Sequence, residues 1–102
     1  MAILYVTEFR DWGQLSAGDI PRAPFITVQQ VSITSSSKTS SAYNNATHVV
    51  RLHADTTCAV QFGTSGSVPT ATTTGSMRLS ANNIGEYFEV NPGDSLAVIA
   101  TT

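Results

Sequence analysis

Two histidines and one aspartate, His48, His53 and Asp55, are the first residues of this chain whose types could do chemistry. Residues 47–54 alternate between apolar and polar side chains, which predicts a half-buried β-strand. Side chains five positions apart point to opposite faces of a strand, so His48 and His53 cannot hold one metal ion together. His53 and Asp55 would share a face, but a lone His-x-Asp pair is a weak signal for acid–base catalysis. We therefore interpret both histidines as exposed strand residues.

The other groups that could react form no recognisable arrangement either. Glu86 and Glu89 occupy opposite strand faces and do not make a glycosidase-like acid pair, and three further carboxylates, Asp11, Asp19 and Asp94, fall in predicted turns or at strand edges. The glycine-rich residues 63–67 lack the lysine and the following helix of a phosphate-binding loop. Cys58 is the only cysteine and lies in an apolar run, so we expect a small buried side chain. We predict no enzyme activity, no metal and no cofactor.

Composition narrows the class of partner. The chain has 102 residues, a net charge of −2 and only 12% charged residues, while serine and threonine make up about a quarter of it. A nucleic-acid-binding protein needs a basic patch that this chain does not have. A surface that is polar through hydroxyl groups is compatible with packing against another protein, although exposed strands rich in threonine have the same composition.

No segment indicates export or membrane insertion. Residues 1–8 lack the basic region and the long apolar stretch of a secretory signal, and no apolar run reaches membrane-spanning length. We expect the protein to be made in a cytoplasm and to leave it only as part of an assembly.

Short alternating runs separated by turn residues predict the secondary structure. The first two strands are expected at 2–9 and 25–33, joined by a long loop, and 34–46 is expected to be either a mobile loop or a segment ordered by a neighbour. Residues 47–54 and 58–62 are predicted to form a hairpin, 63–75 a loop, and 77–79 a short strand or a turn. A second hairpin, 86–90 with 95–100, is predicted around Asn91-Pro92-Gly93-Asp94, since proline and glycine suit the two central positions of a type II turn.

These elements predict an all-β fold. About six or seven short strands with long loops and no helical periodicity are typical of a small antiparallel β-sandwich or a jelly-roll-like barrel. We divide this single domain into an N-terminal strand and docking arm, residues 1–24, and a β-sandwich, residues 25–102.

The second half of the chain resembles a known class of proteins. The resemblance covers residues 47–102, a series of strands and turns that includes 50–63, 69–72, 77–81 and the terminal Glu86 to Ala100 run with its Pro-Gly-Asp turn. This series is similar to small virion proteins of tailed bacteriophages, in particular head decoration (cement) proteins. The resemblance implies a non-enzymatic protein on the capsid surface, bound to the major capsid protein and self-associated as a homotrimer, or next as a dimer. Binding to the assembled lattice alone would stabilise that lattice.

The first half supplies the candidate contact residues. We predict that Tyr5, Phe9, Trp12, Leu15 and Ile20 form the capsid or oligomer interface, because aromatic and large apolar side chains anchor interfaces. The alternative for each is that it closes the core of the domain. A different function is also open: a tail, fibre or lectin-like module in which Trp12, Tyr43 and Tyr87 stack on host glycans.

Overall fold

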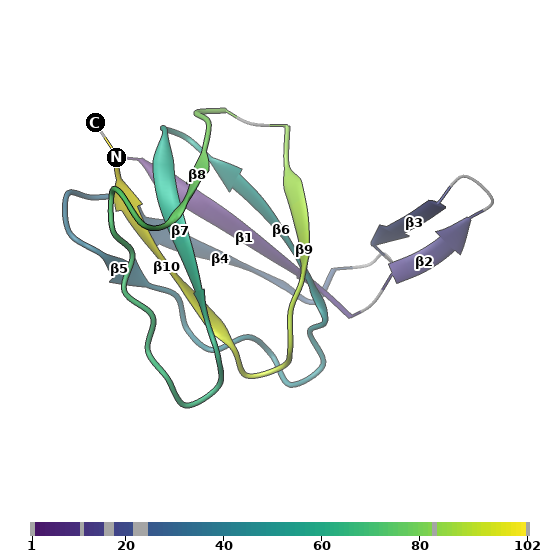
Figure 1. Cartoon of the computed structure of the whole chain (residues 1–102). Helices are drawn as coiled ribbons and strands as arrows, with labels where there is room; N and C mark the ends of the chain where they lie inside the picture. The colour runs from purple at the N-terminus through teal and green to yellow at the C-terminus, as the bar shows by residue number, and fades with distance from the viewer. Residues whose placement is uncertain (1, 11, 16–17, 22–24, 83, 102) are drawn as a thin grey trace.

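Two four-stranded antiparallel sheets form the body of the protein. The computed structural model describes residues 2–10, 12–15, 18–21, 25–82 and 84–101, of which 12–15 and 18–21 are described by their backbone. The strands of sheet 1, in spatial order, are β4 (Thr27–Ser32), β1 (Ile3–Phe9), β6 (Val49–Ala54) and β9 (Glu86–Glu89). Those of sheet 2 are β5 (Lys38–Thr39), β10 (Ser95–Ala100), β7 (Cys58–Gly63) and β8 (Met77–Leu79). Figure 1 shows the two sheets as facing layers, so the predicted all-β sandwich is confirmed.

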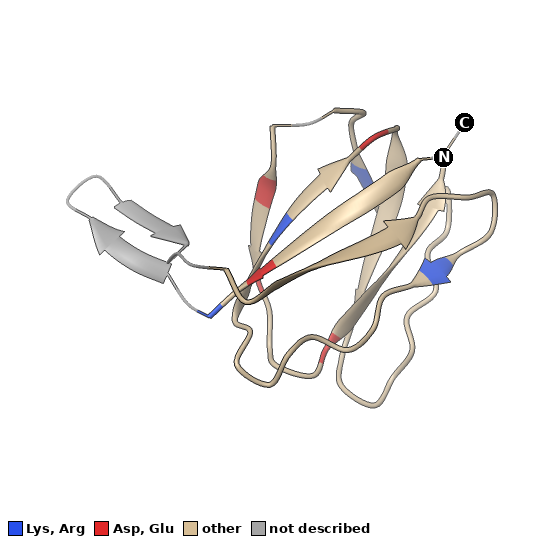
Figure 2. Cartoon of the chain, turned by 180° about the vertical axis from the view of Figure 1, so that it is seen from behind, with Lys and Arg blue, Asp and Glu red and all other residues tan. Residues whose placement is uncertain are grey.

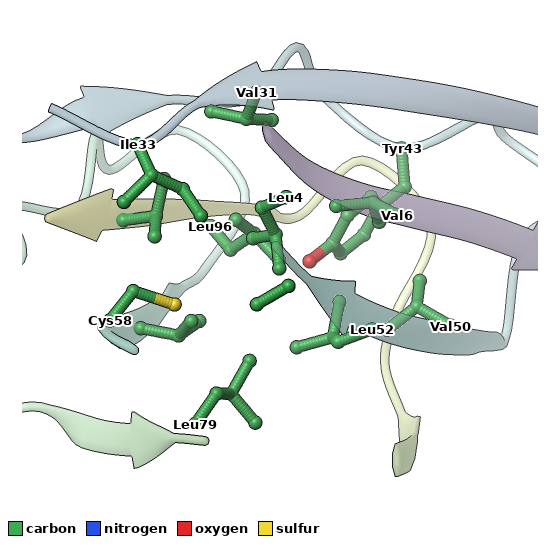
Figure 3. Packing of buried hydrophobic residues seen from close by; sticks show 13 residues of the cluster. Leu4, Val6, Val31, Ile33, Tyr43, Val50, Leu52, Cys58, Leu79 and Leu96 are labelled. Atoms are coloured by element: carbon green, nitrogen blue, oxygen red, sulfur yellow. The ribbon is translucent and has the colours of Figure 1, made fainter. Parts of the chain in front are cut away.

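The core lies between the two layers and follows from strand alternation. Every second residue of β1 and β6 points inward, and these side chains meet those of β7 and β10 from the opposite sheet. Leucine and valine dominate the contact, and most of them are fully buried (Figure 3). The buried cluster consists of Leu4, Val6, Val31, Ile33, Tyr43, Val50, Leu52, Ala54, Cys58, Val60, Leu79, Leu96 and Val98.

Both predicted hairpins are wrong, because in each case the turn joins two strands that belong to different sheets. β6 pairs with β1 and β9 in sheet 1, whereas β7 pairs with β10 and β8 in sheet 2. The 55–57 turn therefore connects two layers and not two neighbouring strands. Leu52 and Cys58 are both buried and face one core from opposite sides. An alternating pattern on either side of a turn is the same in both arrangements, which is why the sequence did not separate them.

The terminal turn has the predicted form and a different role. Gly93 has a φ of 84°, and the Asp94 N–H donates to the Asn91 carbonyl at 3.2 Å, as a type II turn requires. The strands on its two sides, β9 and β10, belong to different sheets. The turn thus carries the chain across the end of the sandwich.

The long loop predicted after the first strand contains two strands. β2 (Trp12–Leu15) and β3 (Gly18–Pro21) pair with each other and form a two-stranded sheet that is separate from sheets 1 and 2 (Figure 1). The division at residue 24 is also not a division of the structure, since β1 is an interior strand of sheet 1, between β4 and β6. Among the described strands, β2 and β3 alone belong to neither four-stranded sheet, and we call residues 10–25 the arm.

The polar segment 34–47 is ordered by contacts within the chain. The Glu8 carboxylate is 1% exposed and accepts hydrogen bonds from the Asn44 N–H at 2.8 Å and the Thr47 hydroxyl at 2.7 Å. The Gln29 side chain also donates to Glu8, at 2.8 Å, and accepts from the Ser41 N–H at 2.9 Å. Contacts within the chain therefore order this segment. The sequence had predicted either a mobile loop or a segment ordered by a neighbouring molecule.

Candidate interaction surface

The outer face of sheet 2 is closed by the chain itself. Ala59 and Ala97 point away from the core, yet both are fully buried. Segment 64–76, between β7 and β8, supplies the buried residues Pro69 and Ala71. Small side chains on the sheet leave room for this cover, and a Cβ placed on Gly63 would lie 2.7–2.8 Å from three atoms of the Pro69 ring.

Hydrogen bonds attach this cover to the sheet. The Ala71 N–H donates to the Ser37 hydroxyl at 2.9 Å, and the Ser76 hydroxyl donates to the Gln61 side chain at 3.1 Å. The contacts reach both the β7 side and the β5 side of sheet 2. Segment 64–76 is therefore a third layer over this face.

The outer face of sheet 1 differs, because large side chains on it remain partly exposed. Val28 and Tyr87 are 40% and 44% exposed, and the outward residues of β1 are half-buried. Val49 is the exception, since it points outward but is fully buried between its register partners Phe9 and Glu89. Charged residues are few on this sheet (Figure 2). We call this surface the open face: Ile3, Tyr5, Thr7, Phe9, Val28, Gln30, Ser32, Arg51, His53, Tyr87 and Glu89.

Ring contacts and one arginine hold the open face in shape. The rings of Phe9 and Tyr87 lie 6.3 Å apart across β6, and those of Tyr5 and His53 lie 6.2 Å apart on paired strands. The Arg51 guanidinium donates to the Ile84 carbonyl at 3.3 Å and packs on Gly85, whose φ is 99°. Rings and an arginine fixed by such contacts lose little conformational entropy on binding, which favours an interface.

The arm leaves the sandwich at the edge of this face. Its root is fixed on both sides, since the Ile26 N–H donates to the Glu8 carbonyl at 2.7 Å and the His48 N–H donates to the Phe9 carbonyl at 3.0 Å. The His48 Nδ1 atom also lies 2.9 Å from the Arg10 carbonyl oxygen. Phe25, at the return of the arm, is 53% exposed. The described residues on both sides of the arm are thus bonded to sheet 1 or to its neighbouring loop.

The predicted interface residues fall on these two features. Tyr5 and Phe9 are on the open face, outside the core cluster, so closing the core is not their role. Trp12 and Leu15 are in β2 and Ile20 is in β3, and the side chains of these three lie outside what the structure describes. The open face also includes Val28 and Arg51, which the sequence interpretation did not select. The sequence signal for this face was in the first strand, where large residues occupy both the inward and the outward positions.

The candidate chemical groups are not brought together. His53 is on the open face, His48 is at the arm root, and the Asp55 carboxylate accepts from the Ile3 N–H at 3.3 Å. Glu86 and Glu89 are on opposite sides of β9, as predicted. Within the described ranges, no group of three or more His, Cys, Asp or Glu residues is placed to hold a metal ion.

Two buried groups have shifted acidity. Cys58 is fully buried, as predicted, and burial raises the pKa of its thiol to about 11. Tyr43 is 3% exposed, and burial, followed by the negative charges of Glu8 and Asp94, raises the pKa of its phenol. A buried Tyr43 cannot stack on a sugar, which corrects its assignment in the glycan-binding alternative. Both groups belong to the core.

A polar groove lies between the edge strands β4 and β5. Its volume is about 360 Å³, and amide, hydroxyl and ammonium groups line it, from Gln29, Gln30, Ser32, Lys38, Thr39, Ser40 and Ser41. The Gln29 side chain is already engaged by Glu8 and Ser41. The groove offers hydrogen-bonding groups and little apolar surface.

Comparisons with known proteins assign no family to this arrangement. No protein-family model, curated protein sequence or solved structure matches the chain. In the part of the chain that the structure describes, no helix is long and apolar enough to cross a membrane.

Proposed function

We propose that this protein is a non-enzymatic structural component of a tailed-phage virion that decorates the head and reinforces the assembled capsid lattice. The observation that carries the proposal is the open face, on which partly exposed rings are held by contacts with one another. A structural protein of this kind needs contact area and not a pocket. The resemblance of residues 47–102 to head decoration proteins supplies the virion context.

Such a protein acts through binding equilibria. A partner that binds the assembled lattice and not its free subunits stabilises the lattice by linkage. Several copies joined to each other gain avidity, because the second and third contacts are intramolecular. In this proposal the major capsid protein is the partner, the copies form a homotrimer or a dimer, and the chain is made in the host cytoplasm and resides on the capsid surface.

The test begins with the genome that encodes the chain. A neighbouring major capsid gene is expected, and heads purified from that phage should contain this chain in many copies. Purified protein should also sediment with expanded empty heads and should raise the temperature at which they disassemble. Heads that lack the chain, or heads to which added protein does not bind, would contradict the proposal.

A tail or fibre module that binds host glycans is the second candidate. The polar groove between β4 and β5 favours it, since amide and hydroxyl groups are suited to sugar hydroxyls. Tyr87 is 44% exposed, whereas Tyr43 is buried. Binding to a glycan array, weakened by Gln30→Ala in the groove and accompanied by the presence of the chain in purified tails, would favour this function over head decoration.

A further inference from the structure

We propose that β4 of one copy pairs in antiparallel fashion with β4 of a second copy, so that two four-stranded sheets become one continuous sheet across a two-fold axis. Val28 of each copy then lies opposite Gln30 of the other. The inference rests on the self-association in the proposed function and selects the dimer. Its test uses purified protein without heads, so it can fail while head binding stands, and the reverse.

The first step is the direction of the backbone hydrogen bonds in sheet 1. The Ile33 N–H donates to the Ala2 carbonyl at 3.0 Å, and on the other side of β1 the Asp55 N–H donates to the Ile3 carbonyl at 3.1 Å. In an antiparallel sheet the residues of one strand bond alternately to its two neighbours. The even-numbered residues of β1 therefore bond to β4, and the odd-numbered residues bond to β6.

This alternation fixes the outward groups of β4. Val28 and Gln30 are the register partners of Thr7 and Tyr5, two odd-numbered residues of β1. The N–H and C=O groups of Val28 and Gln30 thus point away from β1. Among the described strands β4 has a neighbour on one side only, and both residues are exposed. The edge presents two donors and two acceptors to solvent.

The groove beside β4 confirms that segment 34–47 does not cover this edge. Residues 29–32 and 38–41 all line the groove, whose volume is about 360 Å³. Successive side chains of a strand point to opposite faces. Four consecutive residues can line one groove only if their backbone faces it. The backbone edge of β4 is therefore accessible to another strand.

The other three edge strands are protected against such pairing. β9 carries Glu86 and Glu89, β8 has three residues including Arg78, and β5 has two residues including Lys38. Short length and charged side chains are the usual means by which an edge strand avoids pairing with another chain. β4 has six residues, Thr-Val-Gln-Gln-Val-Ser, with no charge and no proline. It is the one edge of the two four-stranded sheets without this protection.

The same contrast identifies a second copy as the partner. A strand that pairs with its own copy brings like charges together, and like charges opposite each other destabilise a sheet. β4 avoids this repulsion, whereas Lys38 disfavours the same contact at the neighbouring edge of sheet 2. The outward groups of Val28 and Gln30 match those of an identical edge turned by a two-fold axis. A contact of this type needs one surface and closes at two copies.

The pairing places both open faces on one side of the dimer. Val28 and Gln30 point to the open face, as their partners Thr7 and Tyr5 do. Residues opposite each other in a sheet have their side chains on the same face. The joined sheet therefore presents two open faces to one partner, and a bivalent contact of this kind gains avidity on a capsid lattice.

The first experiment measures the mass of the protein by sedimentation equilibrium. It compares the full chain with two variants at one position, Gln30→Pro and Gln30→Thr. Proline removes an N–H that faces away from β1, so the ladder between β1 and β4 keeps its bonds. Threonine retains the N–H and suits a strand. We expect dimers of the full chain and of Gln30→Thr, and a Kd raised at least about tenfold for Gln30→Pro.

A second pair of variants tests the contact by charge. Val28→Lys introduces two like charges beside the two-fold axis and should also raise the Kd at least about tenfold. Val68 is 79% exposed and lies in segment 64–76, so Val68→Lys makes the same substitution outside the contact and should form dimers. If Gln30→Pro does not fold by circular dichroism, this pair decides the question.

Amide hydrogen exchange measured by NMR gives the sharpest result. The N–H groups of Gln29 and Val31 face β1 and should exchange slowly at every protein concentration. Those of Val28 and Gln30 should become slow only at concentrations where the dimer forms. Exchange of Val28 and Gln30 that does not change on association would overturn the proposal.

Three results of the mass measurement would also overturn it. A full chain that stays monomeric at about 100 µM, a concentration that reveals even weak association, would leave this edge to a strand of a different protein. A trimer would contradict a contact that closes at two copies. Equal values of Kd for Gln30→Pro and Gln30→Thr would show that the outward N–H takes no part.

Discussion

The outward side chains are covered on one sheet of this sandwich and partly exposed on the other. On sheet 2, small residues such as Ala59 and Ala97 lie beneath a third layer that the chain supplies itself, and they are fully buried. On sheet 1, large residues such as Tyr87 and Val28 point outward and stay partly exposed. The difference teaches that the chain covers one outer face itself and leaves large apolar side chains partly exposed on the other.

Charge distribution strengthens this contrast. Sheet 1 carries its single guanidinium, Arg51, on the open face, and that group is held in place by the Ile84 carbonyl. The Glu8 carboxylate of the same sheet is turned inward and is used to fix segment 34–47. The inner side of sheet 1 therefore serves folding, while its outer side carries one cationic and one anionic side chain, Arg51 and Glu89.

The largest effect is expected for Glu8→Ala, set against its neighbour on the open face, Thr7→Ala. Removal of the Glu8 carboxylate leaves three donors, on Gln29, Asn44 and Thr47, without their acceptor in a buried site. We expect Glu8→Ala to lower the free energy of unfolding by about 3–5 kcal/mol and Thr7→Ala by less than about 1 kcal/mol. Urea denaturation measures both, and similar values for the two variants would break the distinction between the sides of β1.

The next prediction compares the loss in the free energy of unfolding caused by a larger side chain on each outer face. Ala97→Leu introduces a large side chain at a fully buried position on the outer face of sheet 2, whereas Thr7→Leu adds one to the open face. Overpacking should lower the free energy of unfolding by about 1–3 kcal/mol for Ala97→Leu and by close to zero for Thr7→Leu. If thermal unfolding shifts equally for both, segment 64–76 does not close sheet 2 as described.

The Cys58 thiol reports whether the sandwich is sealed. Its pKa of about 11 in the folded protein is above the ordinary value of 9.0, so the folded state retains the thiol proton more strongly than the unfolded state. That contribution to stability is complete below pH 9 and is lost as the pH rises through 11. We expect Cys58→Ala to reduce the loss of stability over this range. The native thiol should react with an aromatic disulfide reagent only as fast as the protein unfolds, and rapid reaction at pH 8 would contradict this.

The smallest effect is expected for Val28→Lys and Val68→Lys. Both residues are exposed valines, so each substitution should change the free energy of unfolding of the monomer by no more than about 0.5 kcal/mol. Only the substitution on the open face should impair assembly. A large loss of monomer stability for Val28→Lys would mean that the open face contributes to folding after all.

The sequence was sufficient for most strands of the sandwich, but not for β5 (Lys38–Thr39), and it was insufficient for their pairing. Strand positions followed from alternation, which also implies that Glu8 points inward after Leu4 and Val6. The assignment of β6 and β7 to different sheets depends on contacts between residues far apart in the chain, and Leu52 and Cys58 have the same pattern in a hairpin. The partners of Glu8, Asn44 and Thr47, lie in a stretch with no apolar periodicity.

The residues of the candidate surface were also predictable only in part, because some of them come together only through strand pairing. Tyr5 and Phe9 were selected because they are aromatic, and the structure puts them on the open face. Val28 and Arg51 join that face only through the register of β4 and β6 against β1. The arm was missed as a hairpin because β2 and β3 are short and contain Gly13, Gly18 and Pro21, which weaken any strand pattern.

Oxidative footprinting of the protein bound to expanded empty heads tests the central claim most directly. Tyr87 on the open face and Met77 in β8 of sheet 2 are both reactive and have similar exposure, 44% and 36%. The account predicts that oxidation of Tyr87 falls strongly between the free protein and the head-bound form, while oxidation of Met77 stays the same. Protection of Met77 with Tyr87 unchanged would contradict it.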